Sequence, residues 1–474
     1  MKFKKIIILI CILILSAEMA SYAIVDNKSK KNNKNNKKIE KSIEPNIIYT
    51  NDVHSVFSLD DCIKVAIANN PDIKASIYNE EVFKSKIGQA WSNYFPTING
   101  GFDFSRNGNK YSHAKHLPYG YKSMYVSMGY VPTVSANMLL FDFGKTKANA
   151  DMAKNMYLAS KEDTKENINT IIYGIKYAYF NILFAQAQIK VYEDTVKDYQ
   201  LQLNQAWSFY KLGKKAKLDV VTADYNLGKA KLNLVKAKNI LEVARTELSR
   251  IMGLPEYTNY ELSDDLILNA LDITSEEAIK MAMDVRPELL SAEKNTKAAK
   301  MNLRAARREF TPNIGAYGSY AYGLGNDYNL RSTQIGVGLD FNALNLMLTK
   351  KQINEAKAEY KKSLAQYDSI RDSVYFNVKK AYIDLQTDKE SIVIAKLALD
   401  QAKEQYRQVT GRYKAGVGDA IELKDGENTY LSARLDFYNA VLNYNLSYAN
   451  LEKEIGVPVK FSDDIIIKTP LSNL

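Results

Sequence analysis

The segment that begins Tyr413-Lys414-Ala415-Gly416 and ends Gly456-Val457-Pro458 occurs twice in this chain. The earlier copy begins Tyr210-Lys211-Leu212-Gly213 and ends Gly253-Leu254-Pro255. The two copies are offset by 203 residues without a gap, and several alanine and leucine positions between their ends coincide at the same offset. A match of this length at one fixed offset indicates an internal repeat.

A second pair of matches precedes the first. Asn70-Pro71-Asp72 resembles Arg286-Pro287-Glu288, and Phe95-Pro96-Thr97-Ile98 resembles Thr311-Pro312-Asn313-Ile314, both at an offset of 216 residues. The chain is therefore a tandem duplication of about 200 residues per copy.

The N-terminus has the composition of a secretory signal. Three lysines among the first five residues precede the apolar run Ile6–Leu15, and Ser21-Tyr22-Ala23 supplies small residues at positions −3 and −1 of a cleavage site. The alternative, a membrane anchor, needs about 20 apolar residues. We expect a signal peptide over residues 1–23, cleaved after Ala23, and a Lys- and Asn-rich disordered linker over residues 24–56.

Charge and cysteine usage exclude several classes of protein. The formal net charge is +10, but residues 1–23 carry +2 of it and residues 24–50 carry +4, which leaves too little to argue for nucleic acid. Cys11 leaves with the signal and lacks the preceding small residue that lipid attachment requires. Cys62 is then the only cysteine, so it forms no intramolecular disulfide and is expected to be a small core residue.

Hydrophobic residues alternate with polar or small ones in two places, which predicts strand pairs at about 97–141 and about 313–341. Each strand is expected to have about ten residues, the length of a tilted membrane-spanning strand. Between the strands of the second pair, Gly323-Leu324-Gly325 is interpreted as a turn, because a phosphate-binding glycine loop lies between a strand and a helix.

A long helix is expected after each strand pair. The first runs from Gly144 to Tyr210, 67 residues or about 100 Å. Gly213 and Gly416 then turn the chain. Each return helix has about half that length, and the short helix from Asp72 to Tyr94 extends it, so each copy is predicted to pair one long helix with two short ones placed end to end.

Four strands per chain cannot close a barrel, and an open sheet edge in lipid leaves backbone groups unpaired. Eight strands from two chains leave an interior filled by side chains, whereas twelve strands from three chains leave a pore. An open pore therefore favours twelve strands from three chains, and the predicted fold is mainly α with membrane β, built from tandem-duplicated long helical hairpins. The predicted divisions are a first repeat (57–255), a connector (256–272), a second repeat (273–458) and a C-terminal tail (459–474).

Residues that could carry chemistry are scarce. The three histidines are His54, His113 and His116, and the last two fall in a predicted surface loop. Acidic pairs on the helices are expected to be mostly solvated, and no Ser/His/Asp or Cys/His set is present. We expect no catalysis, no metal site and no cofactor.

Several short motifs resemble the TolC-type outer-membrane efflux proteins, in the same order and over nearly the whole mature chain. They are Asn69-Asn70-Pro71, Tyr94-Phe95-Pro96, Leu140-Phe141-Asp142-Phe143-Gly144, Tyr413-Lys414-Ala415-Gly416 and Gly456-Val457-Pro458. The resemblance implies a homotrimer in the outer-membrane lipid, in which a trimeric twelve-stranded β-barrel is continued by a trimeric α-barrel tunnel, the long periplasmic extension. It also implies a passive exit duct for a tripartite efflux pump or type I secretion, joined through a periplasmic adaptor to an inner-membrane transporter.

The resemblance also assigns site residues. The family's gate pairs a tyrosine with an aspartate, here Tyr413 and Asp219, and its acidic entrance ring matches Glu422 and Asp425. The family's gate arginine is replaced by Gly418. The helical tips that face the adaptor are formed by two triplets, Leu212-Gly213-Lys214 and Ala415-Gly416-Val417.

The main alternative is a soluble periplasmic coiled-coil adaptor, which also has a signal peptide and antiparallel heptads. The strands distinguish the two, because an adaptor's strands form a small soluble sandwich. A surface filament, a third interpretation, does not need the glycine turns. The sequence leaves open the exported substrate and the class of transporter.

Overall fold

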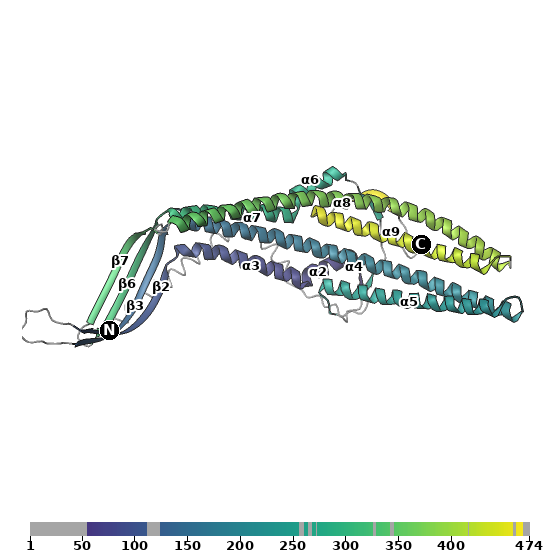
Figure 1. The fold of residues 1–474 in the computed structure, drawn as a ribbon, viewed down its shortest axis with the longest axis horizontal. Helices are drawn as coiled ribbons and strands as arrows, with labels where there is room; N and C mark the ends of the chain where they lie inside the picture. Colours follow the sequence, from purple (N-terminus) through teal and green to yellow (C-terminus); the bar gives the residue numbers. More distant parts are fainter. Residues whose placement is uncertain are drawn as a thin grey trace, which may run out of the picture.

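The computed structural model describes residues 55–110, 124–255, 260–263, 268–271, 273–325, 329–341, 346–415, 417–457 and 461–467. The expected signal peptide, most of the expected linker and all three histidines lie outside these ranges. The molecule is elongated, with a sheet at one end and two helix hairpins that reach the other end (Figure 1).

The two copies have the same order of elements. The first contains α2 (Leu59–Asn69), α3 (Pro71–Trp91), η1 (Ser92–Tyr94), β2 (Thr97–Lys110), β3 (Met124–Phe141), α4 (Lys145–Lys211) and α5 (Lys217–Met252). The second contains α6 (Ser275–Val285), α7 (Pro287–Arg307), η2 (Arg308–Phe310), β6 (Asn313–Gly325), β7 (Asn329–Asp340), α8 (Leu346–Lys414) and α9 (Ala420–Ile455).

Local chemistry sets where the short helices begin. Ser58 caps α2 and Thr274 caps α6, each in a reciprocal capping box with an acid three residues on. Pro71 and Pro287 are the first residues of α3 and α7, where proline's missing N–H costs nothing.

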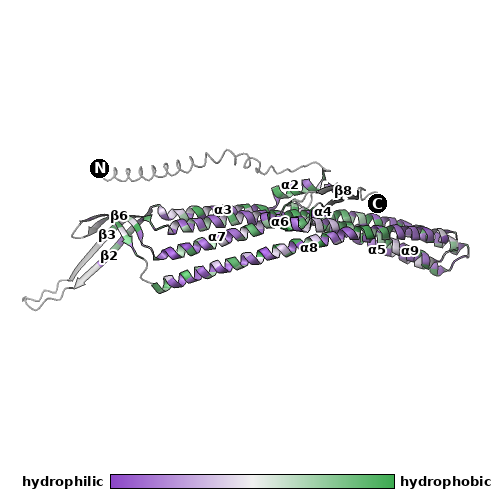
Figure 2. Ribbon diagram, turned by 90° about the horizontal axis from the view of Figure 1, so that it is seen from above, coloured by the Kyte–Doolittle hydropathy of each residue, from purple (hydrophilic) through white to green (hydrophobic). Residues whose placement is uncertain are grey.

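The long helices α4 and α8 have 67 and 69 residues, about 100 Å each. Both α3 and α5 pack along α4, and both α7 and α9 pack along α8 (Figure 1). Hydrophilic and hydrophobic residues alternate along these helices (Figure 2), as expected for helices that are buried on one side. The predicted pairing of one long helix with two short ones is confirmed.

The strands β2, β3, β6 and β7 form one antiparallel sheet in that order. They have 14, 18, 13 and 12 residues, so the predicted length of about ten was too short. The β3–β6 register passes over Val131 and Pro132, because proline has no N–H to donate to a ladder. Gly323-Leu324-Gly325 ends β6, so its interpretation as a turn was wrong.

Two small strand pairs were not predicted. The strand β1 (Ser55–Phe57) pairs in parallel with β4 (Tyr260–Leu262), and β5 (Leu268–Leu271) pairs antiparallel with β8 (Phe461–Ile467). Residues 55 and 56 therefore belong to a strand and not to the disordered linker in which the sequence analysis placed them.

Among the described residues the core consists of two large clusters midway along the helices and a small third one, Tyr199 with Leu227 and Ala230. One large cluster surrounds α4, α5 and α2 and contains the fully buried Cys62, as predicted. The other large cluster surrounds α6, α8 and α9 with Phe437 at its centre. None of the helices in the described ranges combines the length and the apolar character needed to cross a membrane.

Candidate functional site

The first functional surface is the four-stranded sheet, whose register places a set of exposed apolar side chains on one face. This face carries Ile98, Phe102 and Phe104 of β2, Tyr130, Val134 and Met138 of β3, Tyr320 of β6, and Ile335, Val337 and Leu339 of β7. The opposite face carries Asn99, Asp103, Thr133, Ser135, Asn137, Tyr317, Ser319 and Gln334. An apolar face toward lipid and a polar face toward a lumen characterise a membrane-spanning β-barrel wall.

The second functional surface is the pair of helical tips at the far end of the hairpins. At the first tip, Gly213 has φ +70°, and its N–H donates to the Tyr210 carbonyl at 2.9 Å. The Lys214 N–H donates to the Phe209 carbonyl at 2.9 Å. These two bonds form a Schellman motif, in which glycine supplies the left-handed residue. Leu212, at this tip, is 68% exposed to solvent.

At the second tip, Gly416 lies outside the described residues. The N–H groups of Val417 and Gly418 both donate to the Arg412 carbonyl, at 3.1 and 3.0 Å. A Cβ atom at position 418 would lie 2.8 Å from the Tyr413 backbone nitrogen. This close approach leaves no room for a side chain at position 418, where the resemblance leads us to expect an arginine.

The predicted gate residues come from different tips: Asp219 lies at the first tip and Tyr413 at the second. Tyr413 is buried, and the Lys215 ammonium lies 5.7 Å from its ring centroid. Burial, then the charges of Asp219 and Asp419, raise the pKa of the Tyr413 phenol. The Asp219 carboxylate accepts a hydrogen bond from the Ala216 N–H at 3.2 Å. Within the described part of this single chain, no hydrogen bond joins Tyr413 to Asp219.

The predicted acidic pair lies on the first turns of α9. Arg412 Nη1 lies 3.2 Å from Glu422 Oε2, and both side chains are half exposed. The Asp425 side chain is exposed. The sequence analysis missed Arg412 as the partner of Glu422, because ten residues and a turn separate them in the chain.

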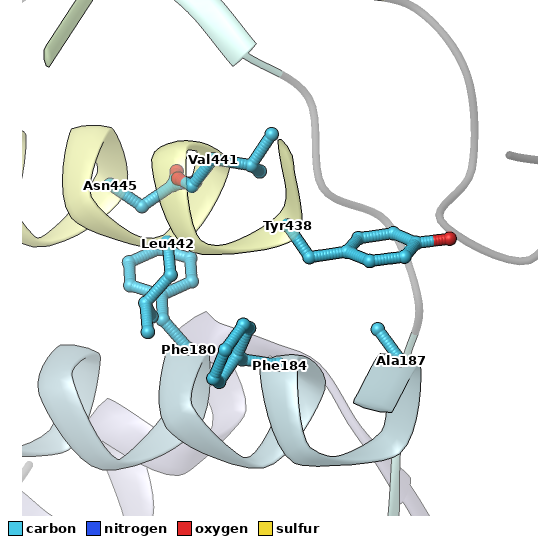
Figure 3. A pocket seen from close by; sticks show the side chains of 7 residues that line it. All are labelled: Phe180, Phe184, Ala187, Tyr438, Val441, Leu442 and Asn445. Carbon is cyan, nitrogen blue, oxygen red and sulfur yellow. The ribbon is translucent and has the colours of Figure 1, made fainter. Parts of the chain in front are cut away.

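Between the hairpins there is a small apolar cavity of about 10 Å³. Figure 3 shows Phe180, Phe184 and Ala187 of α4 facing Tyr438, Val441, Leu442 and Asn445 of α9. Pockets that hold small molecules have about 300–1,000 Å³, so this cavity is a packing defect. Among the described residues, no group of three or more His, Cys, Asp or Glu side chains is placed to hold a metal ion.

A four-stranded wall with one apolar face, continued by helical hairpins of about 100 Å, defines one protomer of an outer-membrane channel with a helical tunnel. Residues 62–254 and 278–457 match the family model described as outer membrane efflux protein, and the chain belongs to that family.

Two curated relatives align over most of their own lengths. The probable efflux pump outer membrane protein TtgC of Pseudomonas putida is 22% identical over 413 residues, 84% of this chain and 83% of TtgC. The outer membrane protein TolC of Escherichia coli is 23% identical over 412 residues, 82% of this chain and 80% of TolC.

A solved structure gives the same result for the fold. The Campylobacter jejuni CmeC outer membrane channel matches with a TM-score of 0.74 and 18% identity, over 86% of this chain and 87% of that one. The predicted resemblance to TolC-type proteins is confirmed, and the alternative of a soluble adaptor is wrong. The comparisons do not test the gate and docking residues, which stay predictions.

Proposed function

We propose that this protein is the outer-membrane exit duct of a multi-protein export assembly, and that three copies form the channel. The observation that carries the proposal is the apolar face of the sheet, combined with its two open edges at β2 and β7. An unpaired edge in lipid costs several kcal/mol per backbone group, so copies must pair edge to edge. Three copies supply twelve strands, enough for a water-filled lumen.

The helices supply a second argument for association. Exposed apolar residues recur at intervals of three, four or seven along α5, at Leu218, Val221, Tyr225, Leu232 and Val235. A similar stripe follows α8, at Phe376, Ile383, Ile394 and Leu397. Apolar stripes of this length are rarely left in water, and this spacing is that of helices packed side by side. We propose that neighbouring copies of the chain cover both apolar stripes.

The tips are the proposed contact with a periplasmic adaptor, and through it with an inner-membrane transporter. They comprise Leu212-Gly213-Lys214 and Ala415-Gly416-Val417, at the end of the helices opposite the sheet (Figure 1). Leu212 and Val417 are 68% and 73% exposed, which gives each tip an apolar contact point. The proposal includes a signal peptide cleaved after Ala23, the predicted division into repeats 57–255 and 273–458, and a passive conduit that is gated at the periplasmic helical tips and carries out no catalysis.

Two experiments test the proposal. Purified protein in a planar bilayer should give discrete single-channel currents, and an absence of current from assembled trimers would overturn it. Deletion of the gene should raise susceptibility to a panel of drugs if the duct serves efflux, or abolish secretion of particular proteins if it serves a secretion system. A deletion strain that behaves like the parent in both assays contradicts an export role.

Docking has its own test. Gly213→Val with Gly416→Val should abolish cross-linking to the adaptor but leave trimer assembly intact, because Gly213 has a left-handed backbone that valine rarely adopts. Gly228→Ala is the matched control, since a Cβ there meets open space. Normal cross-linking of the double variant places the docking site elsewhere.

A further inference from the structure

A buried carboxyl group joins the two hairpins above the tips. Glu427 of α9 is 4% exposed, and its Oε2 accepts a hydrogen bond of 2.9 Å from Nε2 of Gln202 on α4. In the described part of the chain, the other oxygen, Oε1, is buried without a hydrogen-bond partner. A buried charged carboxylate is strongly disfavoured unless it is paired, so this environment favours the protonated group.

Two more polar contacts cross the same interface. The Tyr406 hydroxyl of α8 donates to Asp198 of α4 at 3.4 Å, and Arg434 of α9 donates to Asp194 of α4 at 3.3 Å. With Gln202 and Glu427 they tie α4 to both helices of the second hairpin. An opening motion that separates the hairpins near the tips must break these contacts.

The described groups that face Glu427 include no cation paired with its carboxylate. From α4, Asp198 and Tyr199 lie beside it, and α5 packs against Tyr199 with Leu227 and Ala230. From α8, Tyr406 faces it, and Lys414 acts on Asp198. On α9, Tyr430 stacks on Tyr406, and Arg434 is engaged by Asp194.

The electrostatics agree with this geometry. Burial raises the pKa of Glu427 to about 7, and the charge of Asp198 adds to the rise. Hydrogen bonding from Gln202 and from the Tyr199 hydroxyl opposes it. Burial also raises the pKa of Asp198, which the Tyr406 hydrogen bond opposes.

We propose that Glu427 and Gln202 form a latch between the hairpins, in addition to the predicted gate at the tips; this latch holds a proton while the channel is closed and releases it on opening. The inference rests on the proposed gated channel and names a regulator of it. The protonated carboxyl packs against α4 without an unpaired charge. Once it ionises, Glu427 and Asp198 repel each other across the interface, and water becomes the better environment for both.

The sign of the pH dependence follows from where the proton is held more tightly. In an open state that exposes Glu427, its pKa returns to about 4.3. Between about pH 4.3 and about pH 7, Glu427 is therefore mostly protonated in the closed state and mostly ionised in the open state. Acid therefore stabilises the closed state, and this stabilisation is lost as the pH rises through about 7. From pH 5.5 to 8.5, the open-to-closed ratio should rise about 30-fold per chain.

The test measures open probability in a planar bilayer at pH 5.5 and 8.5. Wild type should open more at pH 8.5, whereas Glu427→Gln should stay mostly closed at both values, because its amide cannot ionise. Gln202→Ala should raise open probability at pH 5.5, because it removes the donor across the interface. Asp436→Asn, an exposed carboxylate on the same helix, is the matched control and should behave like wild type.

The outcomes separate the latch from the channel itself. A wild type that never conducts contradicts the proposed channel. A wild type that conducts equally at both pH values, or a Glu427→Gln variant that keeps the wild-type pH response, contradicts the latch. If Glu427→Gln does not assemble by light scattering, Gln202→Ala decides: unchanged open probability at pH 5.5 contradicts the latch.

Discussion

The side-chain amide of Asn70 donates a hydrogen bond of 2.8 Å to the backbone carbonyl of Ile251. At the equivalent positions of the second copy, Nη1 of Arg286 donates to the backbone carbonyl of Glu454 at 2.6 Å. Gly253 and Gly456 are also equivalent. A Cβ atom at Gly253 would lie 3.0 Å from the Asn69 backbone just before α3, and one at Gly456 would lie 3.0 Å from Pro287 Cδ at the start of α7. Duplication has therefore preserved one tertiary contact, made by an amide in one copy and a guanidinium in the other.

Asn70→Ala should destabilise the protein by about 2–4 kcal/mol. The buried Asn70 also caps α3, accepting from the N–H groups of Asp72 and Ile73 at 2.8 and 3.2 Å. Loss of the cap costs about 1 kcal/mol, and the unpaired Ile251 carbonyl costs about 1–3 kcal/mol. Asn70→Ser keeps the cap and should lose only the second part. Thermal unfolding followed by circular dichroism measures the stability of both variants. Equal losses of stability in Asn70→Ala and Asn70→Ser would contradict the division into a cap contribution and a carbonyl contribution.

Arg286→Met should destabilise the protein by about 3–5 kcal/mol, because it removes the buried partner of Glu454 and leaves that carboxylate only Lys453, whose ammonium lies 4.0 Å away. Arg286 and Glu454 are 2.6 Å apart, and both side chains are buried. Arg286→Met combined with Glu454→Leu should recover much of the loss. The matched control is Arg250→Met, whose exposed pair with Glu247 is worth about 0–1 kcal/mol. Similar losses at positions 286 and 250 would contradict the role of burial.

Asp142 connects β3 to α4 and should make stability depend on acid. Its carboxylate accepts from the Tyr94 hydroxyl at 2.7 Å and from the N–H groups of Gly144 and Thr146 at 3.0 and 2.5 Å. Burial raises the pKa of Asp142, but these bonds outweigh it and lower the pKa overall.

A lowered carboxyl pKa stabilises the fold above its unfolded value of about 3.9, and this stabilisation is lost as the pH falls through the folded value. Asp142→Asn should therefore lower the unfolding temperature at pH 7 and reduce its further fall below about pH 4. Tyr94→Phe removes one donor and should cost about 1 kcal/mol. If the unfolding temperature of Asp142→Asn falls with acid as that of wild type does, the ionised Asp142 carboxylate does not stabilise the fold.

Tyr413→Phe with Asp219→Ala should raise single-channel conductance. The two residues sit on opposite tips, close enough for the Asp219 charge to raise the pKa of Tyr413. A hydrogen bond between them in the closed trimer would cost about 1–3 kcal/mol to break. Conductance equal to that of the parent would place the gate elsewhere.

Cation preference should follow the charge near α9's first turns. Glu422→Ala with Asp425→Ala should reduce cation preference and weaken block by multivalent cations, because carboxylates at a narrow pore attract cations. Arg412→Ala should do the opposite, since it frees Glu422 from its ion pair. Reversal potentials in a salt gradient measure the cation preference of both variants. Values identical to that of the parent would show that Glu422, Asp425 and Arg412 are surface residues away from the pore.

The long hairpins could be predicted because their signals are local and repeated: a 3-4 apolar spacing, a glycine at each turn of the sequence, and a duplicated motif. The strands β1, β4, β5 and β8 could not, since they have three to seven residues and β1 and β8 pair with partners about 200 positions away. The end of β2 was missed because Arg106–Lys110 has no apolar alternation.

The candidate site was predicted less completely than the fold. Gly213 and Tyr413 were predicted from motifs, and their docking and gate roles stay predictions. Arg412 and Glu427 have no sequence signal that separates them from solvated helix residues. Acidic residues on the helices were expected to be mostly solvated, yet Glu427, Glu452 and Glu454 are buried. Burial of a single helix position depends on which neighbouring helix covers it, and sequence periodicity does not give that at one-residue precision.

The central claim is that copies of this chain close one another's sheet, and the oligomeric state tests it most directly. Multi-angle light scattering of the detergent-purified protein, corrected for bound detergent, should give the mass of three chains, with strand content retained by circular dichroism. A stable monomer with the same strand content would contradict the account, because four strands with two open edges cannot persist in lipid.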